Sequence, residues 1–218
     1  MKQIPVNHYY PAFLDLRGRH CIIIGAGEIA ERKVQQLLGC EALITFISPE
    51  ASTYINNLAQ EKMVIWLKRN YQIGDLSDAF LAIAATEDTE VNQAVYSEAE
   101  TRGILVNIVD VPHLCSFIAP AVIEKGPVKV AISTAGTSPA LARKLRETIQ
   151  ASDLLAWSDA AKTLSEVRQE LKETNSQASP ETWQTAMDGE VLSLIQAGDY
   201  KNAKARLLSA LRGEGDQI

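Results

Sequence analysis

The chain has 218 residues, of which 46% are hydrophobic and 22% are charged, a balance ordinary for a globular protein with one main core and a smaller second unit. Its formal net charge of −6 argues against a nucleic-acid-binding protein, although it leaves room for a local basic pocket. The sequence shows neither an apolar run of the roughly 20 residues that cross a bilayer nor the apolar core of a signal peptide. Its three cysteines have no paired spacing, so we expect reduced thiols and a cytoplasmic location.

Strand-like and helix-like stretches alternate between residues 20 and 109. Five apolar runs have the near-continuous hydrophobicity of strands that are buried on both faces: CIIIG, LITFIS, MVIWL, FLAIAAT and ILVNIVD. The stretches EIAERKVQQLLG and TEVNQAVYSEAETRG, which lie between such runs, have helical patterns. This alternation predicts the α/β class, with a parallel sheet that is covered by helices.

The pattern changes after residue 112. The stretch SFIAPAVIEKGPVKVAISTAG predicts two short strands around the turn EKGP. The next stretch, TSPALARKLRETIQ, predicts a helix that is capped by Ser138 and opened by Pro139. From about residue 152 the patterns are helical only, and a polar break, KETNSQASP, precedes the predicted helices SPETWQTAM and YKNAKARLLSALRG. We therefore expect an α+β region and then a small helical domain.

A glycine turn, G-x-G-x-x-A, spans residues 25–30 between an apolar run and a helix. In such a turn the first glycine permits the bend, the second lets the backbone approach a pyrophosphate, and the third small residue lets the helix pack closely. The N-terminus of the helix attracts the phosphates. A tight turn without a ligand is the alternative, but the strand–turn–helix context favours a Rossmann-type dinucleotide site. The predicted phosphate-binding residues are Gly25, Ala26, Gly27, Glu28 and Ile29.

The second predicted strand ends in FISPEAS, at the place where an acidic residue usually binds the ribose hydroxyls. Ser48 occupies that place and is followed by Pro49 and Glu50, so we predict that these three residues contact the ribose. No lysine or arginine lies between Leu43 and Gln60, although a 2′-phosphate would need such a cation. The sequence therefore predicts NAD, and not NADP, as the cofactor.

Four motifs occur in a fixed order: G-A-G-x-x-A-x-R-K, A-A-T-x-D-x-x-V-N, N-x-V-D with S-F-I-x-P following, and G-T-S-P-x-L-A-R. Together they resemble the precorrin-2 dehydrogenase family, which includes the N-terminal part of multifunctional sirohaem synthases. The resemblance covers residues 9–150. It implies an enzyme that oxidises precorrin-2 to sirohydrochlorin with NAD, in sirohaem biosynthesis.

The resemblance also implies three parts and a homodimer whose sites use both chains. We expect a NAD-binding Rossmann domain at residues 1–113, a dimerisation and substrate-binding region at 114–150, and a helical C-terminal domain at 151–218. The apolar, strand-like segment 116–134 points the same way, since it follows the sheet and needs a partner surface. The expected partners are a tetrapyrrole substrate and a second copy of the chain, without nucleic acid or membrane.

Asp110 is the candidate catalytic residue. It lies at the carboxyl end of the fifth predicted strand, where ligands of this fold bind. A carboxylate at this place could take the proton that is lost when a CH–CH unit of a tetrapyrrole is oxidised. The resemblance implies the same role, because Asp110 matches the aspartate of N-x-V-D, which is regarded as the general base of the family. The structural alternative is a turn-forming aspartate before Val111 and Pro112.

Three other polar residues near this edge allow more than one interpretation. The hydroxyl of Thr86, which ends another strand, either meets the cofactor or caps the next helix. Asn107 points to one face of its strand or the other, and the sequence leaves both open. His113 lies near the predicted site, but metal sites usually gather several ligands, so we predict no metal site.

The segment STAGTSPALARKLR, residues 133–146, is the predicted substrate site. Precorrin-2 is a polycarboxylate, so its site should be locally basic although the chain is acidic. The N-terminus of the predicted helix can attract an anion, and the arginines and lysine that follow add positive charge. Ordinary capping and a solvated helix face explain the same residues, and spacing alone favours that alternative. The predicted substrate-binding residues are Ser133, Thr134, Thr137, Ser138 and Arg143.

Two further functions are open. Some members of the family also insert iron into the product, so a bifunctional precorrin-2 dehydrogenase and sirohydrochlorin ferrochelatase is one alternative. The Asp110 motif does not separate the two enzymes, because one carboxylate could serve both reactions. A nucleotide-sensing regulatory module is the other alternative, and it would need neither Asp110 nor a basic G-T-S-P segment. The presence of both features favours an enzyme.

Overall fold

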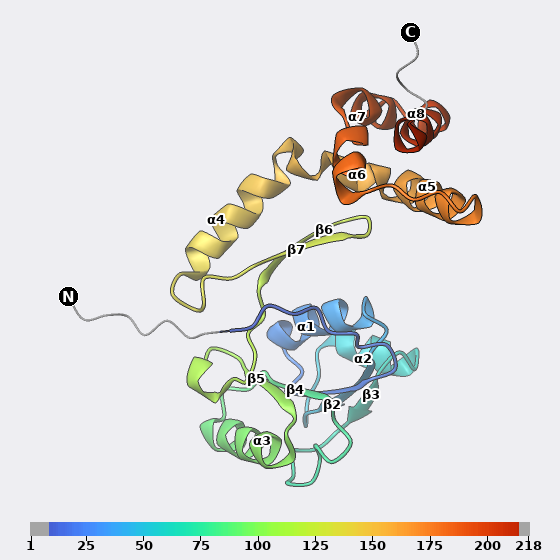
Figure 1. Ribbon diagram of the computed structural model, residues 1–218. Helices are drawn as coiled ribbons and strands as arrows, with labels where there is room; N and C mark the ends of the chain where they lie inside the picture. The colour runs from blue at the N-terminus through green and yellow to red at the C-terminus, as the bar shows by residue number, and fades with distance from the viewer. Residues whose placement is uncertain (1–8, 214–218) are drawn as a thin grey trace, which may run out of the picture. The chain divides into compact units, whose positions relative to one another are not determined.

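The computed structural model describes residues 9–213, and the ends of the first and third predicted domains, residues 1–8 and 214–218, lie outside this part. The chain forms two compact units, which are coloured along the chain in Figure 1. One unit contains the chain up to Ala119 together with Ala135–Thr137, and the other contains Pro120–Thr134 and the chain from Ser138 onward.

The first unit is built on a five-stranded parallel sheet with the strand order β3-β2-β1-β4-β5. The last residues of the strands lie in one row across the sheet, in the order Leu67, Ile47, Ile24, Ala84 and Ile108. All carboxyl ends therefore meet at one edge, and the predicted α/β class with a Rossmann-type sheet is confirmed. The strands are β1 (His20–Ile24), β2 (Leu43–Ile47), β3 (Ile65–Leu67), β4 (Leu81–Ala84) and β5 (Leu105–Ile108).

Helices cover both faces of this sheet, with α1 and α2 on one face and α3 on the other (Figure 1). Alternate residues of a strand point to opposite faces, so Ile23 belongs to the core beneath α1 and α2, whereas Ile22 and Ile24 belong to the core beneath α3. Burial on both faces explains why the strands are almost continuously apolar. The helices are α1 (Glu28–Leu38), α2 (Thr53–Gln60) and α3 (Thr89–Arg102).

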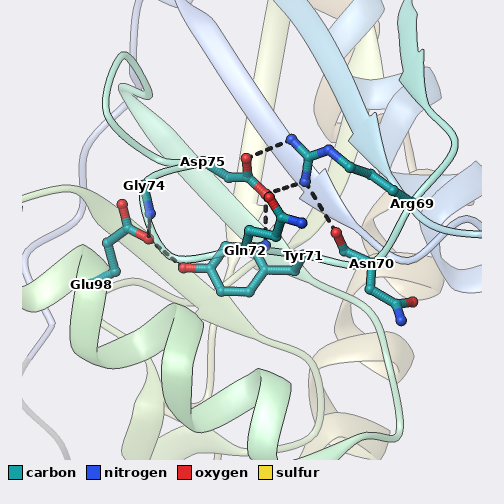
Figure 2. A network of polar contacts seen from close by, with 7 residues as sticks. All are labelled: Arg69, Asn70, Tyr71, Gln72, Gly74, Asp75 and Glu98. Carbon is teal, nitrogen blue, oxygen red and sulfur yellow. Dashed lines mark hydrogen bonds and ion pairs between the residues drawn. The ribbon is translucent and has the colours of Figure 1, made fainter.

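The connection between β3 and β4, which the structure describes throughout, contains no helix and is held by two groups of polar contacts (Figure 2). In one group, the guanidinium of Arg69 donates two hydrogen bonds of 2.7 Å to the carboxylate of Asp75. In the other, the buried carboxylate of Glu98 on α3 accepts hydrogen bonds from the Tyr71 hydroxyl at 2.5 Å and the Gly74 N–H at 2.9 Å. The loop is therefore anchored to α3 by side-chain contacts.

The second unit begins with an antiparallel hairpin, as the EKGP turn predicts. The hairpin packs against α4, and the hydroxyl of Ser138 caps this helix by accepting a hydrogen bond of 3.3 Å from the Leu141 N–H. The helices that follow share a separate core. The elements are β6 (Ala121–Lys125), β7 (Val128–Ile132), α4 (Pro139–Gln150), the 3-10 helix η2 (Asp153–Ala160), α5 (Ala161–Glu173), α6 (Pro180–Ala186), α7 (Gly189–Gln196) and α8 (Tyr200–Arg212).

Helix α7, like α2, is not among the stretches that the sequence patterns single out as helices. It is capped by Asp188, whose carboxylate accepts a hydrogen bond of 2.8 Å from the Val191 N–H, and it buries Val191 and Ile195. An element of eight residues contains too few apolar positions for a helical period to stand out. Among the residues that the structure describes, no helix has the length and apolarity of a membrane span.

Glu98 provides a pH-dependent test of the β3–β4 loop. Burial alone raises the pKa of Glu98, but hydrogen bonds from Tyr71, Gly74 and Arg102 outweigh it and lower the pKa below its ordinary value. The ionised network therefore stabilises the fold above the unfolded-state pKa of about 4.3, and this contribution is lost as the pH falls through the lower folded-state pKa. We expect Glu98→Gln to lower the stability at pH 7 by about 1–2 kcal/mol.

We also expect the melting temperature of Glu98→Gln to fall less than that of the parent between about pH 5 and pH 3, because the variant has no carboxylate to protonate. Thermal unfolding followed by circular dichroism measures both effects. An equal pH dependence in the two proteins would contradict a stabilising role for the ionised Glu98.

Candidate active site

Backbone hydrogen bonds continue beyond the ends of the strands, so the loops that follow neighbouring strands also lie side by side. The Gly25 N–H donates to the Ile47 carbonyl at 3.0 Å, so the glycine turn begins beside the end of β2. The Ala85 N–H donates to the Ile24 carbonyl at 2.8 Å, so the loop after β4 begins beside the end of β1. These bonds place the predicted phosphate-binding and ribose-binding residues and Thr86 on the same edge of one sheet.

The fold needs glycine at only one of the two glycine positions in the turn. Gly25 has a φ of +94°, and a Cβ at this position would lie 2.3 Å from the carbonyl oxygen of Ala85. A side chain is excluded there by the backbone conformation and by the close approach. Gly27 has a φ of −90°, which any residue adopts, and a Cβ at this position would meet nothing within 4 Å. The fold requires Gly25, whereas Gly27 leaves open space.

This open space lies at the start of α1. Gly27 is the N-cap residue of α1 and provides no side chain to the N–H groups of the first turn. Glu28 and Ile29, which follow, are exposed, whereas Ala30 is buried beneath the helix. The turn thus combines open space with helix N–H groups, and this arrangement fits the pyrophosphate of a dinucleotide.

The predicted ribose residues follow β2 directly. Ser48 is half-buried, and Pro49 and Glu50 are exposed. The indole N–H of Trp66 on β3 donates to the Ser48 carbonyl at 2.9 Å, which fixes the backbone at this point. Sequence reasoning missed Trp66, because its contact depends on the pairing of β2 with β3 and not on a local motif.

Thr86 lies after β4 and braces the start of α3. Its hydroxyl accepts a hydrogen bond of 3.2 Å from the Asp88 N–H, while the cap of α3 is the carboxylate of Asp88 itself. The buried side-chain amide of Asn92 on α3 donates to the Thr86 carbonyl at 3.1 Å and so fixes the backbone of this turn. The capping role therefore falls to Asp88, and a contact between Thr86 and the cofactor stays a prediction.

Asn107 on β5 has a structural role. It is 9% exposed, and its amide donates to the Phe117 carbonyl at 3.0 Å. The thiol of Cys115 lies beside it and accepts a hydrogen bond of 3.2 Å from the Ile108 N–H. These contacts fold the segment that follows β5 back against the strand, and the Asn107 amide helps to hold this segment in place.

Asp110 lies two residues beyond the end of β5, and its side chain is exposed. Its φ of +61° is in the left-handed region, which aspartate tolerates better than most residues. In the described chain its carboxylate makes no hydrogen bond and no ion pair within 4 Å. Burial and Arg32 lower the pKa of Lys33 on α1, and the charge of Asp110 partly offsets them, so Asp110 lies within electrostatic range of α1. Asp110 thus forms a turn and also presents its carboxylate to solvent.

His113 lies on the next turn, the 3-10 helix η1 (Pro112–Leu114), and is exposed. Among the described residues, no group of three histidine, cysteine, aspartate or glutamate side chains is placed to hold a metal ion.

The predicted substrate residues are divided between the two units. Thr137 groups with the first unit, while Ser133, Thr134 and Ser138 belong to the second. The Thr134 hydroxyl accepts a hydrogen bond of 3.1 Å from the Ser138 N–H and donates one of 3.0 Å to the Ser138 carbonyl. These two bonds close a tight loop between Thr134 and Ser138. Within the loop, Ala135 and Gly136 have positive φ angles and therefore left-handed backbone conformations. The substrate role of the loop stays a prediction.

Arg143 lies on the surface of α4. It is exposed and donates a hydrogen bond of 2.8 Å to Glu147, one turn further along the helix. This pair corresponds to the solvated helix face that the sequence analysis considered as the alternative. A substrate carboxylate would have to compete with Glu147 for the guanidinium.

A family described as putative NAD(P)-binding matches residues 12–121, which is half of the chain. The chain belongs to this family. A second family, described as sirohaem biosynthesis protein central, matches residues 125–152. The two matches cover the glycine turn, the Asp110 motif and the G-T-S-P motif in the order that the resemblance predicts.

Similar proteins include two sirohaem synthases. That of Nitrosomonas europaea is 36% identical over 213 residues, which are 96% of this chain and 45% of that protein. That of Photorhabdus laumondii is 37% identical over 201 residues, which are 91% of this chain and 43% of that protein. The chain therefore spans less than half the length of these curated relatives.

A solved structure, "SirC, precorrin-2 dehydrogenase", has the same fold, with a TM-score of 0.75 and 25% identity over 91% of this chain and 100% of that one. The resemblance to the precorrin-2 dehydrogenase family, which the four motifs predict, is confirmed by these comparisons.

Alanine substitutions at Gly25 and Gly27 distinguish the effect of each glycine on folding stability from its effect on NAD binding. Gly25→Ala places a methyl group against the Ala85 carbonyl in a left-handed backbone, and we expect it to destabilise the protein by about 3 kcal/mol. Gly27→Ala is expected to change the stability by less than about 1 kcal/mol. Denaturant unfolding measures both values.

Gly27→Ala should nevertheless weaken NAD binding by about tenfold or more, because the methyl group fills the space into which the pyrophosphate is expected to fit. Titration calorimetry with NAD provides this second measurement. A stable Gly27→Ala protein that binds NAD as tightly as the parent would show that the phosphates lie elsewhere.

Proposed function

We propose that the chain is an NAD-dependent precorrin-2 dehydrogenase, which converts precorrin-2 into sirohydrochlorin in sirohaem biosynthesis. The observation that carries this proposal is the common edge of the sheet, where the glycine turn and Asp110 both follow the carboxyl ends of parallel strands. The likeness to a precorrin-2 dehydrogenase over 91% of the chain supports the substrate class. The free state of all three cysteines supports a reducing, cytoplasmic compartment.

The reaction removes two hydrogens from a CH–CH unit of the tetrapyrrole, one as a hydride and one as a proton. NAD, when bound, supplies the hydride acceptor. The start of α1 would hold the phosphates, and Ser48 and Glu50 would accept hydrogen bonds from the ribose hydroxyls. Asp110 takes the proton on a carboxylate oxygen, and it does so without first breaking another contact of the described chain.

The experiment that tests this function combines the purified protein with precorrin-2 and NAD. We expect the absorption spectrum of sirohydrochlorin to appear, with one NADH formed for each product molecule. A parent protein that gives no product with NAD would refute the proposal. Repeating the reaction with Fe²⁺ or Co²⁺ decides the bifunctional alternative, because only a chelatase converts the product further.

Asp110→Asn tests the proton acceptor, since it keeps the shape of the side chain and removes the basic carboxylate. We expect the rate of precorrin-2 oxidation in a single turnover to fall by about a hundredfold or more, the usual scale of a lost general base. The melting temperature and the Kd for NAD should remain nearly unchanged, because the phosphates are held at the start of α1. A stable variant that binds NAD normally and oxidises precorrin-2 at the parent rate would remove Asp110 from the mechanism.

We also propose that the second unit pairs with a second copy of the chain. A two-stranded hairpin is marginally stable alone, and large apolar side chains of the second unit remain exposed on β6 and α4. These are Val122, Leu141 and Leu145, which are 38%, 50% and 41% exposed. Light scattering should give a mass near twice the 23.8 kDa of one chain.

Leu145→Lys should shift the protein toward the monomer, because it places a charge on the apolar face of α4. Gln150→Lys, an exposed change on the opposite side of the same helix, is the matched control and should leave the mass unchanged. A parent that is monomeric at micromolar concentration would contradict the homodimer.

A further inference from the structure

The end of β3 lies beside the predicted ribose site. A single oxygen, the carbonyl of Leu67, accepts a hydrogen bond of 3.3 Å from the Ser48 N–H and another of 2.8 Å from the Arg69 N–H. The backbones of Ser48 and Arg69 are therefore close enough for an extended arginine side chain to span the distance between them. Residues 43–60 contain no lysine or arginine, but the pairing of β2 with β3 brings Arg69 close to the predicted ribose site.

The guanidinium of Arg69 is engaged with its own loop. It donates two hydrogen bonds of 2.7 Å to Asp75 in a bidentate pair, and a third of 3.0 Å to the Asn70 carbonyl (Figure 2). The Gln72 N–H also donates to Asp75, at 2.8 Å, which fixes the carboxylate. Hydrogen bonding from Arg69 lowers the pKa of Asp75, so the carboxylate remains ionised at neutral pH.

Lys68 is a second cation at this strand end. Its ammonium lies 5.5 Å from the centre of the Trp66 ring, and no carboxylate within the described chain forms an ion pair with it. Trp66 is the residue that holds the Ser48 carbonyl. A lysine is a flexible point charge, whereas an arginine presents a planar fork that matches a phosphate. Replacing Lys68 and replacing Arg69 should therefore affect the binding of a 2′-phosphate differently.

We propose that the Arg69–Asp75 pair determines the choice between NAD and NADP. Asp75 holds the guanidinium within the β3–β4 loop, and the ribose site then offers the oxygen acceptors of Ser48 and Glu50 to a 2′-hydroxyl group. A 2′-phosphate would meet these acceptors without the arginine that could neutralise it. The inference rests on the proposed function, because it concerns the cofactor of the same site.

Asp75→Asn tests the pair, because it removes the charge that holds Arg69 and keeps the shape of the side chain. We expect the Kd for NADP to fall by about tenfold or more, the scale of one new charge-assisted contact, while the Kd for NAD changes by less than about threefold. Titration calorimetry on the purified full chain measures both constants without the tetrapyrrole.

Further variants make the test specific. The double variant Asp75→Asn/Arg69→Gln should lose the gain in NADP affinity, whereas Asp75→Asn/Lys68→Gln should keep it. Tyr71→Phe removes a hydrogen bond to Glu98 in the same loop without touching the pair (Figure 2), and this matched control should bind NADP as weakly as the parent. Asp75→Ser, which keeps an acceptor for the Gln72 N–H, replaces Asp75→Asn if that variant does not fold.

The outcomes separate the inference from the proposed function. A parent that binds neither NAD nor NADP would overturn the proposed function and this inference with it. A parent that binds NAD, with an Asp75→Asn variant that gains no affinity for NADP, would overturn the inference alone. A gain that disappears with Lys68→Gln, or that Tyr71→Phe reproduces, would also overturn the assignment to Arg69.

Discussion

The close approach of Gly25 to the carbonyl oxygen of Ala85 is the constraint on which the nucleotide-binding edge depends. It lets the turn after β1 cross directly beside the turn after β4, and this crossing leaves no room for a Cβ. Because β1 and β4 are adjacent although they are far apart in the sequence, the strand order reverses at this point. Ligands of doubly wound sheets bind where the strand order reverses. Gly25, which allows the two turns to approach each other, therefore also determines the position of the nucleotide-binding edge.

The sheet and the position of its active edge could be predicted from the sequence because they depend on local signals. Continuous apolar runs indicate strands that are buried on both faces, and the spacing of Gly25 and Gly27 indicates a phosphate turn. The same reasoning placed Asp110 after the last strand. It did not anticipate that this aspartate has a left-handed backbone, because φ depends on the turn after β5, in which the Val111 N–H donates to the Ile108 carbonyl at 3.2 Å.

Other features depend on contacts between segments that a linear pattern does not reveal. Residues 43–60, which contain β2 and α2, include no cation near the predicted ribose site, whereas the pairing of Ile47 with Leu67 brings Arg69, two residues after β3, close to it. The contact of Trp66 with Ser48 arises in the same way. Helix α7 was missed for a different reason, since a short element with two buried positions carries little periodic signal.

The helix-free connection between β3 and β4 has a consequence for local motion. In a helical crossover the backbone amides bond to carbonyls of the same helix, and they exchange with solvent when that helix unwinds. Here the amides of Gln72 and Gly74 are bound by the carboxylates of Asp75 and Glu98. Their hydrogen exchange should therefore follow the release of these two carboxylates, so that this segment opens locally while the parallel sheet stays intact.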